Sequence, residues 1–137
     1  MSAVRFQSFE EFWPVYVRAH SHKTNRMLHF AGTTAALGSL AAGVLLLRPK
    51  LLVLAPLCGY GMAWIGHFFV EKNRPAAFGN PLWSLRADLV MWSKILSGTM
   101  DAEVARVLSR NGAHASNGEV RHAGYAASPP EGRQSVN

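Results

Sequence analysis

Several features that the sequence lacks exclude classes of function before any motif is considered. Cys58 is the single cysteine, so no disulfide can form within the chain. There is no glycine-rich phosphate loop, no C-x-x-C pair, no G-x-S-x-G nucleophile elbow and no internal repeat. We do not expect the first apolar block to be a signal peptide, because it begins too late and lacks a small-residue cleavage site. The chemistry is therefore sought among the other side chains, above all the histidines.

Two long apolar blocks, residues 28–47 and 51–70, dominate the sequence. Each has about 20 residues, which at about 1.5 Å of rise per residue matches a hydrocarbon core of roughly 30 Å. Only Arg48, Pro49 and Lys50 connect them, so the two helices must be antiparallel. The blocks predict a hairpin of two transmembrane helices. The alternative is a soluble bundle with a buried helical hairpin.

The 137-residue chain is basic, with 14 Lys and Arg residues, 8 Asp and Glu residues and a formal net charge of +6. A basic chain can bind nucleic acid, but here the basic residues flank the apolar blocks, which favours membrane lipid as the partner and no nucleic acid. They gather before and after the hairpin: Arg5, Arg18, Lys23, Arg26, Lys72, Arg74, Arg86 and Lys94. The positive-inside rule then predicts an integral, multi-pass membrane protein with both termini cytoplasmic. Its membrane would be the inner membrane of a bacterium or the endoplasmic reticulum of a eukaryote.

A short amphipathic helix is predicted before the hairpin. Ser8 and Glu11 have the S-x-x-E spacing of a capping box. Apolar residues then recur at helical spacing, at Phe9, Phe12, Trp13, Tyr16 and Val17. A helix so rich in aromatic residues is typical of one that lies in the membrane interface. The alternative is a helix packed on a protein core. Residues 22–24 are expected to form a polar turn.

A second amphipathic helix is predicted after the hairpin. Asn80 and Pro81 mark its start, Asp88 leans toward its apolar side, and its apolar stripe is Leu82, Leu85, Leu89, Trp92 and Leu96. A third, short helix is expected at about residues 101–108. The predicted fold is an all-α membrane domain over residues 1–110, in which two transmembrane helices form a hairpin with flanking amphipathic interfacial helices.

The last 27 residues, 111–137, have a different composition. They are rich in Gly, Ala, Ser and Pro and show no periodicity. We expect them to form a disordered C-terminal tail. His114 and His122 lie in this tail, and we give them no role.

Three histidines are predicted to meet at one level of the membrane. His29 lies 20 residues before Pro49 and His67 lies 18 residues after it, so their depths differ by only about 3 Å. His20 ends a helix that is expected at the same depth. The two hairpin histidines lie on stripes of small residues, which let helices approach closely: Gly32, Ala36, Gly43, Gly59, Ala63 and Gly66.

Converging histidines predict a metal site, because neutral imidazole suits iron, copper, zinc or nickel. Glu71 lies one turn after His67, and Asn25 lies one turn before His29. Each of these two residues could bind the metal or orient a ligand. The alternative is that every histidine is a hydrogen-bonding residue at the membrane interface.

The sequence resembles the Mpo1-like family over about residues 6–100. The resemblance rests on the stretches HSHKTNRMLHFAG, GYGMAWIGHFFVEKNRPAAF and PLWSLRADLVMW. The family elements H-x₄-N-x₃-H and G-H-x₃-E-x₂-P correspond here to His20, Asn25 and His29 and, with one extra residue before the proline, to Gly66, His67, Glu71 and Pro75. His22 stands outside the shared pattern.

The resemblance implies an iron enzyme. Characterised eukaryotic members are endoplasmic-reticulum membrane proteins and Fe(II)-dependent dioxygenases of 2-hydroxy fatty acids, in the α-oxidation of long-chain bases such as phytosphingosine. By resemblance, the catalytic metal ligands are His20, His29, His67 and Glu71, and Asn25 and Asp88 support them. The implied partners are a 2-hydroxy fatty acid, O₂ and membrane lipid. A homo-oligomer is left open.

Two other functions are compatible with a hairpin that carries histidines. One is a small non-catalytic membrane scaffold whose histidines are structural. Iron analysis distinguishes it, because the oxygenase should hold iron and the scaffold none. The other is a metal transporter, which is disfavoured because two spans enclose no pathway without oligomerisation.

The distribution of basic residues generates a prediction about topology. A reporter fused to the C-terminus should lie in the cytoplasm, and a reporter inserted at residues 48–50 should lie on the opposite side of the membrane. An exported C-terminus would contradict the assignment.

Overall fold

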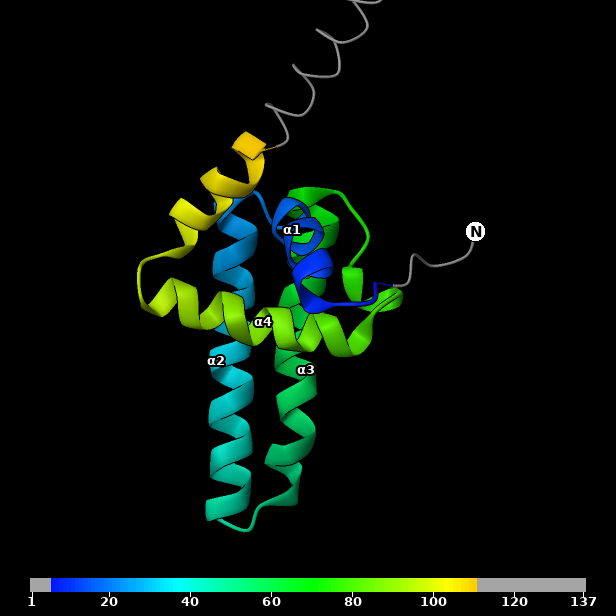
Figure 1. Ribbon diagram of the computed structural model, residues 1–137. Helices are drawn as coiled ribbons and strands as arrows, with labels where there is room; N and C mark the ends of the chain where they lie inside the picture. Colours follow the sequence, from blue (N-terminus) through cyan, green and yellow to red (C-terminus); the bar gives the residue numbers. More distant parts are fainter. Residues whose placement is uncertain (1–5, 111–137) are drawn as a thin grey trace, which may run out of the picture. The chain divides into compact units, whose positions relative to one another are not determined.

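The computed structural model describes residues 6–110, and this part of the chain is all-α, as predicted. Its elements are α1 (Phe9–Ala19), α2 (Lys23–Leu45), α3 (Pro49–Ile65), a π-helical turn η1 (Gly66–Glu71), a 3₁₀ turn η2 (Ala76–Phe78) and α4 (Pro81–Leu96) (Figure 1). A last helical segment covers residues 100–110. All contacts below lie within the first of two compact units, which ends at Val107. The predicted tail, 111–137, lies outside the described residues.

The helices α2 and α3 run side by side as the predicted hairpin (Figure 1). Glycine makes their close approach possible. A Cβ built on Gly32 would lie 2.8 Å from the Cβ of Met62, and one on Gly43 would lie 2.6 Å from the side chain of Leu52. A Cβ built on Gly59 would lie 3.7 Å from the Cβ of Ala36, so the two predicted stripes of small residues do meet.

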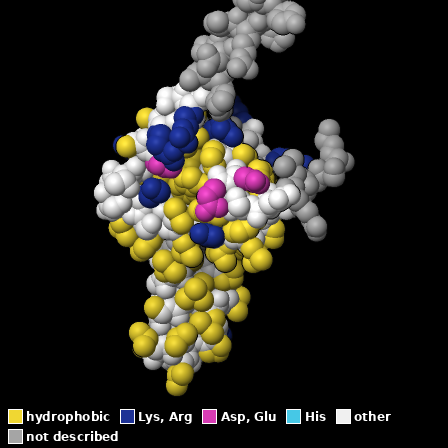
Figure 2. All heavy atoms as spheres, in the orientation of Figure 1, with side chains coloured by type: hydrophobic (Ala, Val, Ile, Leu, Met, Phe, Trp, Pro, Cys, Tyr) yellow, Lys and Arg dark blue, Asp and Glu magenta, His cyan; other side chains and the backbone are white. Residues whose placement is uncertain are grey.

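Both hairpin helices are long and apolar enough to span a membrane. The spans are Lys23–Leu45 and Pro49–Glu71, and only 17% and 22% of their apolar windows are buried. The core helix of a soluble protein would be mostly buried, so these values favour a membrane protein. In Figure 2, hydrophobic side chains cover the hairpin below α4, whereas the charged side chains on this face gather at the level of α4 and above it. The exposed apolar residues near the connection include Val44, Leu45, Leu46, Leu47, Leu52, Val53 and Leu57.

The aromatic face of α1 packs inside the protein. Its buried residues form one core with α4 and the last helical segment: Phe12, Trp13, Tyr16, Val17, Ala87, Met91, Met100, Val104 and Val107. The Trp13 Nε1–H also donates to Glu103 at 2.7 Å. The amphipathic pattern is confirmed, but the expectation that this face meets lipid is wrong, because protein covers it.

The start of α2 also differs from the prediction. His22 does not belong to a polar turn that continues to residue 24. It is the N-cap of α2, and its Nδ1 accepts a hydrogen bond from the Thr24 N–H at 3.3 Å. The capping box of α1 forms in part, because the Ser8 hydroxyl accepts from the Glu11 N–H at 3.3 Å. The Glu11 carboxylate, however, accepts from the N–H of Gln7 and not of Ser8.

The helix α4 lies across α2 and presents two different faces (Figure 1). The leucines of the predicted apolar stripe are exposed: Leu82, Leu85, Leu89 and Leu96. Trp92, its fifth member, is partly buried and packs against Phe30 of α2. The opposite face buries Ser84, Ala87 and Met91. Since the exposed stripe is apolar, α4 is the flanking helix whose outer face is suited to lipid.

The hairpin contact generates a prediction with a matched control. Gly32→Ala should destabilise the protein by about 1–3 kcal/mol, because the added methyl group meets Met62 and the carbonyl of Cys58. Gly38→Ala, in the same helix, meets nothing within 4 Å, so it should be neutral or stabilising by about 0.5–1 kcal/mol. Thermal unfolding in detergent would measure both. Equal stability of the two variants would contradict the packing of α2 on α3.

Candidate metal centre

His20 is held at the C-terminal end of α1. Its ring is buried, and it stacks on the ring of Tyr16 with centroids 3.9 Å apart. Its Nδ1 lies 2.7 Å from the carbonyl oxygen of Tyr16. A carbonyl oxygen only accepts hydrogen bonds, so Nδ1 carries the proton and Nε2 has a lone pair. The Tyr16 turn therefore fixes both the orientation and the tautomer of His20.

His29 is oriented by α4. Its Nδ1 lies 2.9 Å from the Asp88 carboxylate, which also accepts a hydrogen bond from the Tyr16 hydroxyl. Burial, and next the neighbouring carboxylate, raise the pKa of Tyr16 well above its usual value, so this hydroxyl keeps its proton and donates. A carboxylate partner on Nδ1 again leaves Nε2 as the atom available to a metal.

His67 lies in the π-helical turn η1. The left-handed Lys72 (φ 55°) folds the chain back, so that the Asn73 N–H donates to the His67 carbonyl at 3.0 Å. The Asn73 Oδ1 lies 2.7 Å from the His67 Nδ1, and the Asn73 amide nitrogen donates to the carbonyl of Ala19 at 3.0 Å. The second bond fixes the direction of the amide, so the oxygen faces the histidine and Nδ1 is the donor. Short π-helical turns are frequent at functional sites.

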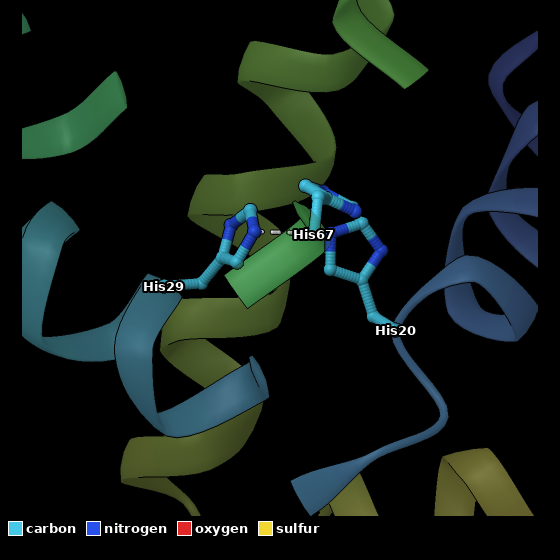
Figure 3. A group of neighbouring side chains, drawn as sticks. All are labelled: His20, His29 and His67. Carbon is cyan, nitrogen blue, oxygen red and sulfur yellow. Dashed lines mark hydrogen bonds between the residues drawn. The ribbon is translucent and has the colours of Figure 1, made fainter. Parts of the chain in front are cut away.

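The three histidines converge from α1, α2 and η1 (Figure 3). Nitrogen atoms from all three rings lie within 4.8 Å of one another. The Nε2 atoms of His20 and His29 are 3.2 Å apart, and the tautomers assigned above give neither atom a proton. Two lone pairs at this distance repel each other unless a cation lies between them. The predicted meeting of His20, His29 and His67 is confirmed.

The environment of His20 disfavours its protonation. Burial, and then the rings of His29 and His67, hold the pKa of His20 well below its usual value. A cavity of about 20 Å³ lies against all three histidines, which is room for one small ion or water. Neutral imidazoles in a small buried cavity fit a transition-metal ion. The site therefore suits a metal, whose identity the nitrogen atoms alone do not determine.

Glu71 and Asn25 lie beside this group and are not part of it. The Glu71 carboxylate accepts from the His22 N–H at 2.7 Å and from the Asn25 amide at 3.5 Å. The hydrogen bonds of this carboxylate are thus made to the start of α2 and not to the histidines. Among the described residues, the group able to hold a metal comprises the three histidines alone. Asp88, by contrast, supports His29 as predicted.

Three residues that support the histidines were not singled out by sequence reasoning. Tyr16 entered only as part of an apolar face, and Asn73 as part of a turn-rich connection. Arg26 entered only as a flanking charge, yet its buried guanidinium donates to the His20 carbonyl at 3.0 Å and pairs with Asp101 at 2.7 Å. Tyr16 lies four residues before His20, so helical spacing could have linked these two residues. No such spacing relates Asn73 or Arg26 to the histidine that each supports.

An apolar groove adjoins the histidines. Its volume is about 240 Å³, and α2, α3 and α4 line it. The groove shares six residues with the small cavity: His29, Tyr60, Ala63, Ala77, Ser84 and Asp88. Along α2 it extends from His29 to Leu40, about 16 Å of helix. The arrangement can hold the polar end of a long apolar molecule at the metal centre and its chain along the hairpin.

Comparison with known proteins gives one finding. The family model described as 2-hydroxy-palmitic acid dioxygenase Mpo1-like matches residues 6–100. No curated protein and no solved structure matches the chain. The matched range contains the three converging histidines, Asn73 and Asp88. The chain belongs to the Mpo1-like family.

Proposed function

We propose that this protein is an Fe(II)-dependent membrane dioxygenase that removes one carbon from 2-hydroxy fatty acids. The observation that carries the proposal is the junction between the three-histidine centre and the apolar groove. A metal site alone would fit many functions, and an apolar groove alone would fit any lipid. Together they match an amphiphilic substrate, and the family description names such a substrate, 2-hydroxy-palmitic acid.

His20, His29 and His67 would hold the iron through Nε2. Their Nδ1 atoms are engaged by the Tyr16 carbonyl, the Asp88 carboxylate and the Asn73 amide oxygen. Such partners orient a ligand and raise its basicity. We assign Glu71 a positioning role, because its carboxylate joins the end of η1 to the start of α2.

Iron(II), when bound, supplies a site for O₂ and for the oxygen atoms of the substrate head group. Oxidative cleavage between C1 and C2 gives the acid one carbon shorter. Release of C1 as carbon dioxide, with one water, balances the atoms and the four electrons of one O₂, so no external reductant is needed. The chain's own residues exclude bulk water, since all three histidines are at most 4% exposed.

The groove would hold the acyl chain beside the hairpin. Its walls carry mostly apolar side chains such as Leu37, Leu40 and Leu85, and burying a methylene group contributes about 0.8 kcal/mol. We further propose that the hairpin crosses the membrane with both termini cytoplasmic. A fatty acid dissolved in the bilayer could then enter the groove with its chain still surrounded by apolar atoms.

A non-catalytic scaffold with structural histidines is the second candidate. Structural histidines would be expected to satisfy both ring nitrogens with hydrogen-bond partners. Here the Nε2 atoms of His20 and His29 face each other at 3.2 Å, and the donors of both rings are already used. This contact favours a metal centre over a scaffold.

The ligand assignment is tested by removing each imidazole. Alanine at His20, His29 or His67 should abolish stoichiometric iron and the production of the shortened acid, because each change removes one of three nitrogen ligands. His22→Asn is the control: it keeps a residue suited to the N-cap, so its iron content should match that of the parent protein. Metal analysis of detergent-purified protein measures the result. Full iron in all three alanine variants would refute the metal centre.

The supporting contact is tested at Asp88. Asp88→Asn keeps the size of the side chain but removes the negative charge that faces the His29 Nδ1–H. Iron affinity, measured by competition with a chelator, should fall about 10- to 100-fold. Glu71→Gln, in which the amide oxygen can still accept from the His22 N–H, should change it far less. A loss of iron in Glu71→Gln as complete as in the histidine variants would show that Glu71 is a ligand.

A further inference from the structure

The Ser84 hydroxyl is buried without a partner. The residue lies in the first turns of α4 and is 4% exposed, and its Oγ makes no hydrogen bond. Serine and threonine in helices usually donate to a carbonyl of the preceding turn. Three such hydroxyls of this chain do so: Thr34 to Phe30 at 2.7 Å, Ser93 to Val90 at 2.9 Å and Ser97 to Lys94 at 3.2 Å. The Ser84 O–H, by contrast, is not used in any hydrogen bond within the protein, although leaving a buried hydroxyl unpaired costs free energy.

Ser84 lies where the small cavity meets the groove, because it lines both. At this junction the head group of a bound fatty acid would meet its apolar chain. The neighbouring Asp88 carboxylate already accepts from His29 and Tyr16. The Ser84 hydroxyl differs from this carboxylate, because it can donate a hydrogen bond and has no acceptor in the protein.

The residues around the junction indicate which group of a bound ligand would accept a hydrogen bond from Ser84. Among the described residues that line the cavity and the groove, none is Lys or Arg. Two hydroxyl-bearing residues line both, and of these Tyr60 is 49% exposed whereas Ser84 is buried. The Asp88 carboxylate can only accept hydrogen bonds, so it offers nothing to a substrate carboxylate. A carboxylate oxygen that enters this apolar neck needs a hydrogen-bond donor, and hydrogen bonds to charged groups are the stronger ones.

We propose that Ser84 donates a hydrogen bond to the carboxylate of the bound fatty acid. The bond would hold C1 at the histidine cavity while the chain lies in the groove, which makes Ser84 a substrate-binding residue. The inference rests on the proposed function, because it takes its ligand from it.

The experiment measures binding without turnover. Iron-loaded protein in detergent is titrated under anaerobic conditions with 2-hydroxypalmitic acid and with hexadecane-1,2-diol, which keeps the chain and the 2-hydroxyl but lacks the carboxylate. Ser84→Ala should weaken binding of the acid about tenfold and binding of the diol much less, because a hydrogen bond to a neutral hydroxyl is weaker than one to a carboxylate. Ser93→Ala is the matched control on the same helix. Its side chain is exposed and donates to a carbonyl, so both ligands should bind as to the parent protein.

A second measurement separates substrate binding from a structural role. Since the Ser84 hydroxyl has no partner in the protein, Ser84→Ala should keep its iron and unfold at the same or a higher temperature without ligand. Ser84→Cys, with a weaker donor, should show an intermediate loss of affinity for the acid. A structural hydroxyl would instead give a variant that is less stable and binds both ligands more weakly.

The outcomes distinguish this inference from the proposed function. If the parent protein holds iron but does not bind 2-hydroxypalmitic acid, the proposed substrate is wrong and the inference falls with it. If the parent binds the acid and Ser84→Ala binds it equally well, only the inference is wrong. Equal weakening of the acid and the diol would also overturn it, because the carboxylate would then not be the partner.

Discussion

The site depends on a close contact between imidazole nitrogens that face one another. The Nε2 atoms of His20 and His29 lie 3.2 Å apart, and both rings use their protons on partners behind them. Packing does not favour this contact by itself, because two unprotonated nitrogens gain nothing from proximity. A bound cation reverses the sign of the interaction. The surrounding elements can therefore be understood as a frame that holds three nitrogen lone pairs in place for a metal ion.

The frame combines three elements that differ in how they are fixed. The hairpin fixes His29 and His67, because glycines such as Gly32 let the two helices approach closely. A Cβ built on Gly66 would lie 1.9 Å from the Asn25 side chain, so the same close approach continues beside the site. His20 is fixed separately, by the aromatic core of α1 and by Arg26. The three histidines therefore depend on two separate packing arrangements, that of the hairpin and that of α1.

Residue counting along the chain predicted the hairpin and the level at which its histidines meet. It succeeded because helix rise is set by backbone hydrogen bonds and varies little with sequence. Counting could not decide between the two roles predicted for Glu71, whose carboxylate accepts from the His22 N–H and the Asn25 amide. It also could not find Asn73, which reaches His67 through a left-handed residue at position 72. The periodicity of α1 showed that one face is covered but could not show whether protein or lipid covers it.

The helix α4 connects the metal centre to the lipid-facing surface of the protein. Its inner face carries Asp88 and Ser84 to the junction between cavity and groove, while its outer leucines are exposed. The same helix thus orients a candidate metal ligand, lines the groove and carries an exposed apolar surface suited to lipid. In a soluble enzyme these tasks would conflict, because an exposed leucine stripe on an active-site helix promotes association. In the membrane enzyme proposed above, the stripe would instead anchor the helix, and the groove would lie beside the phase in which fatty acids dissolve.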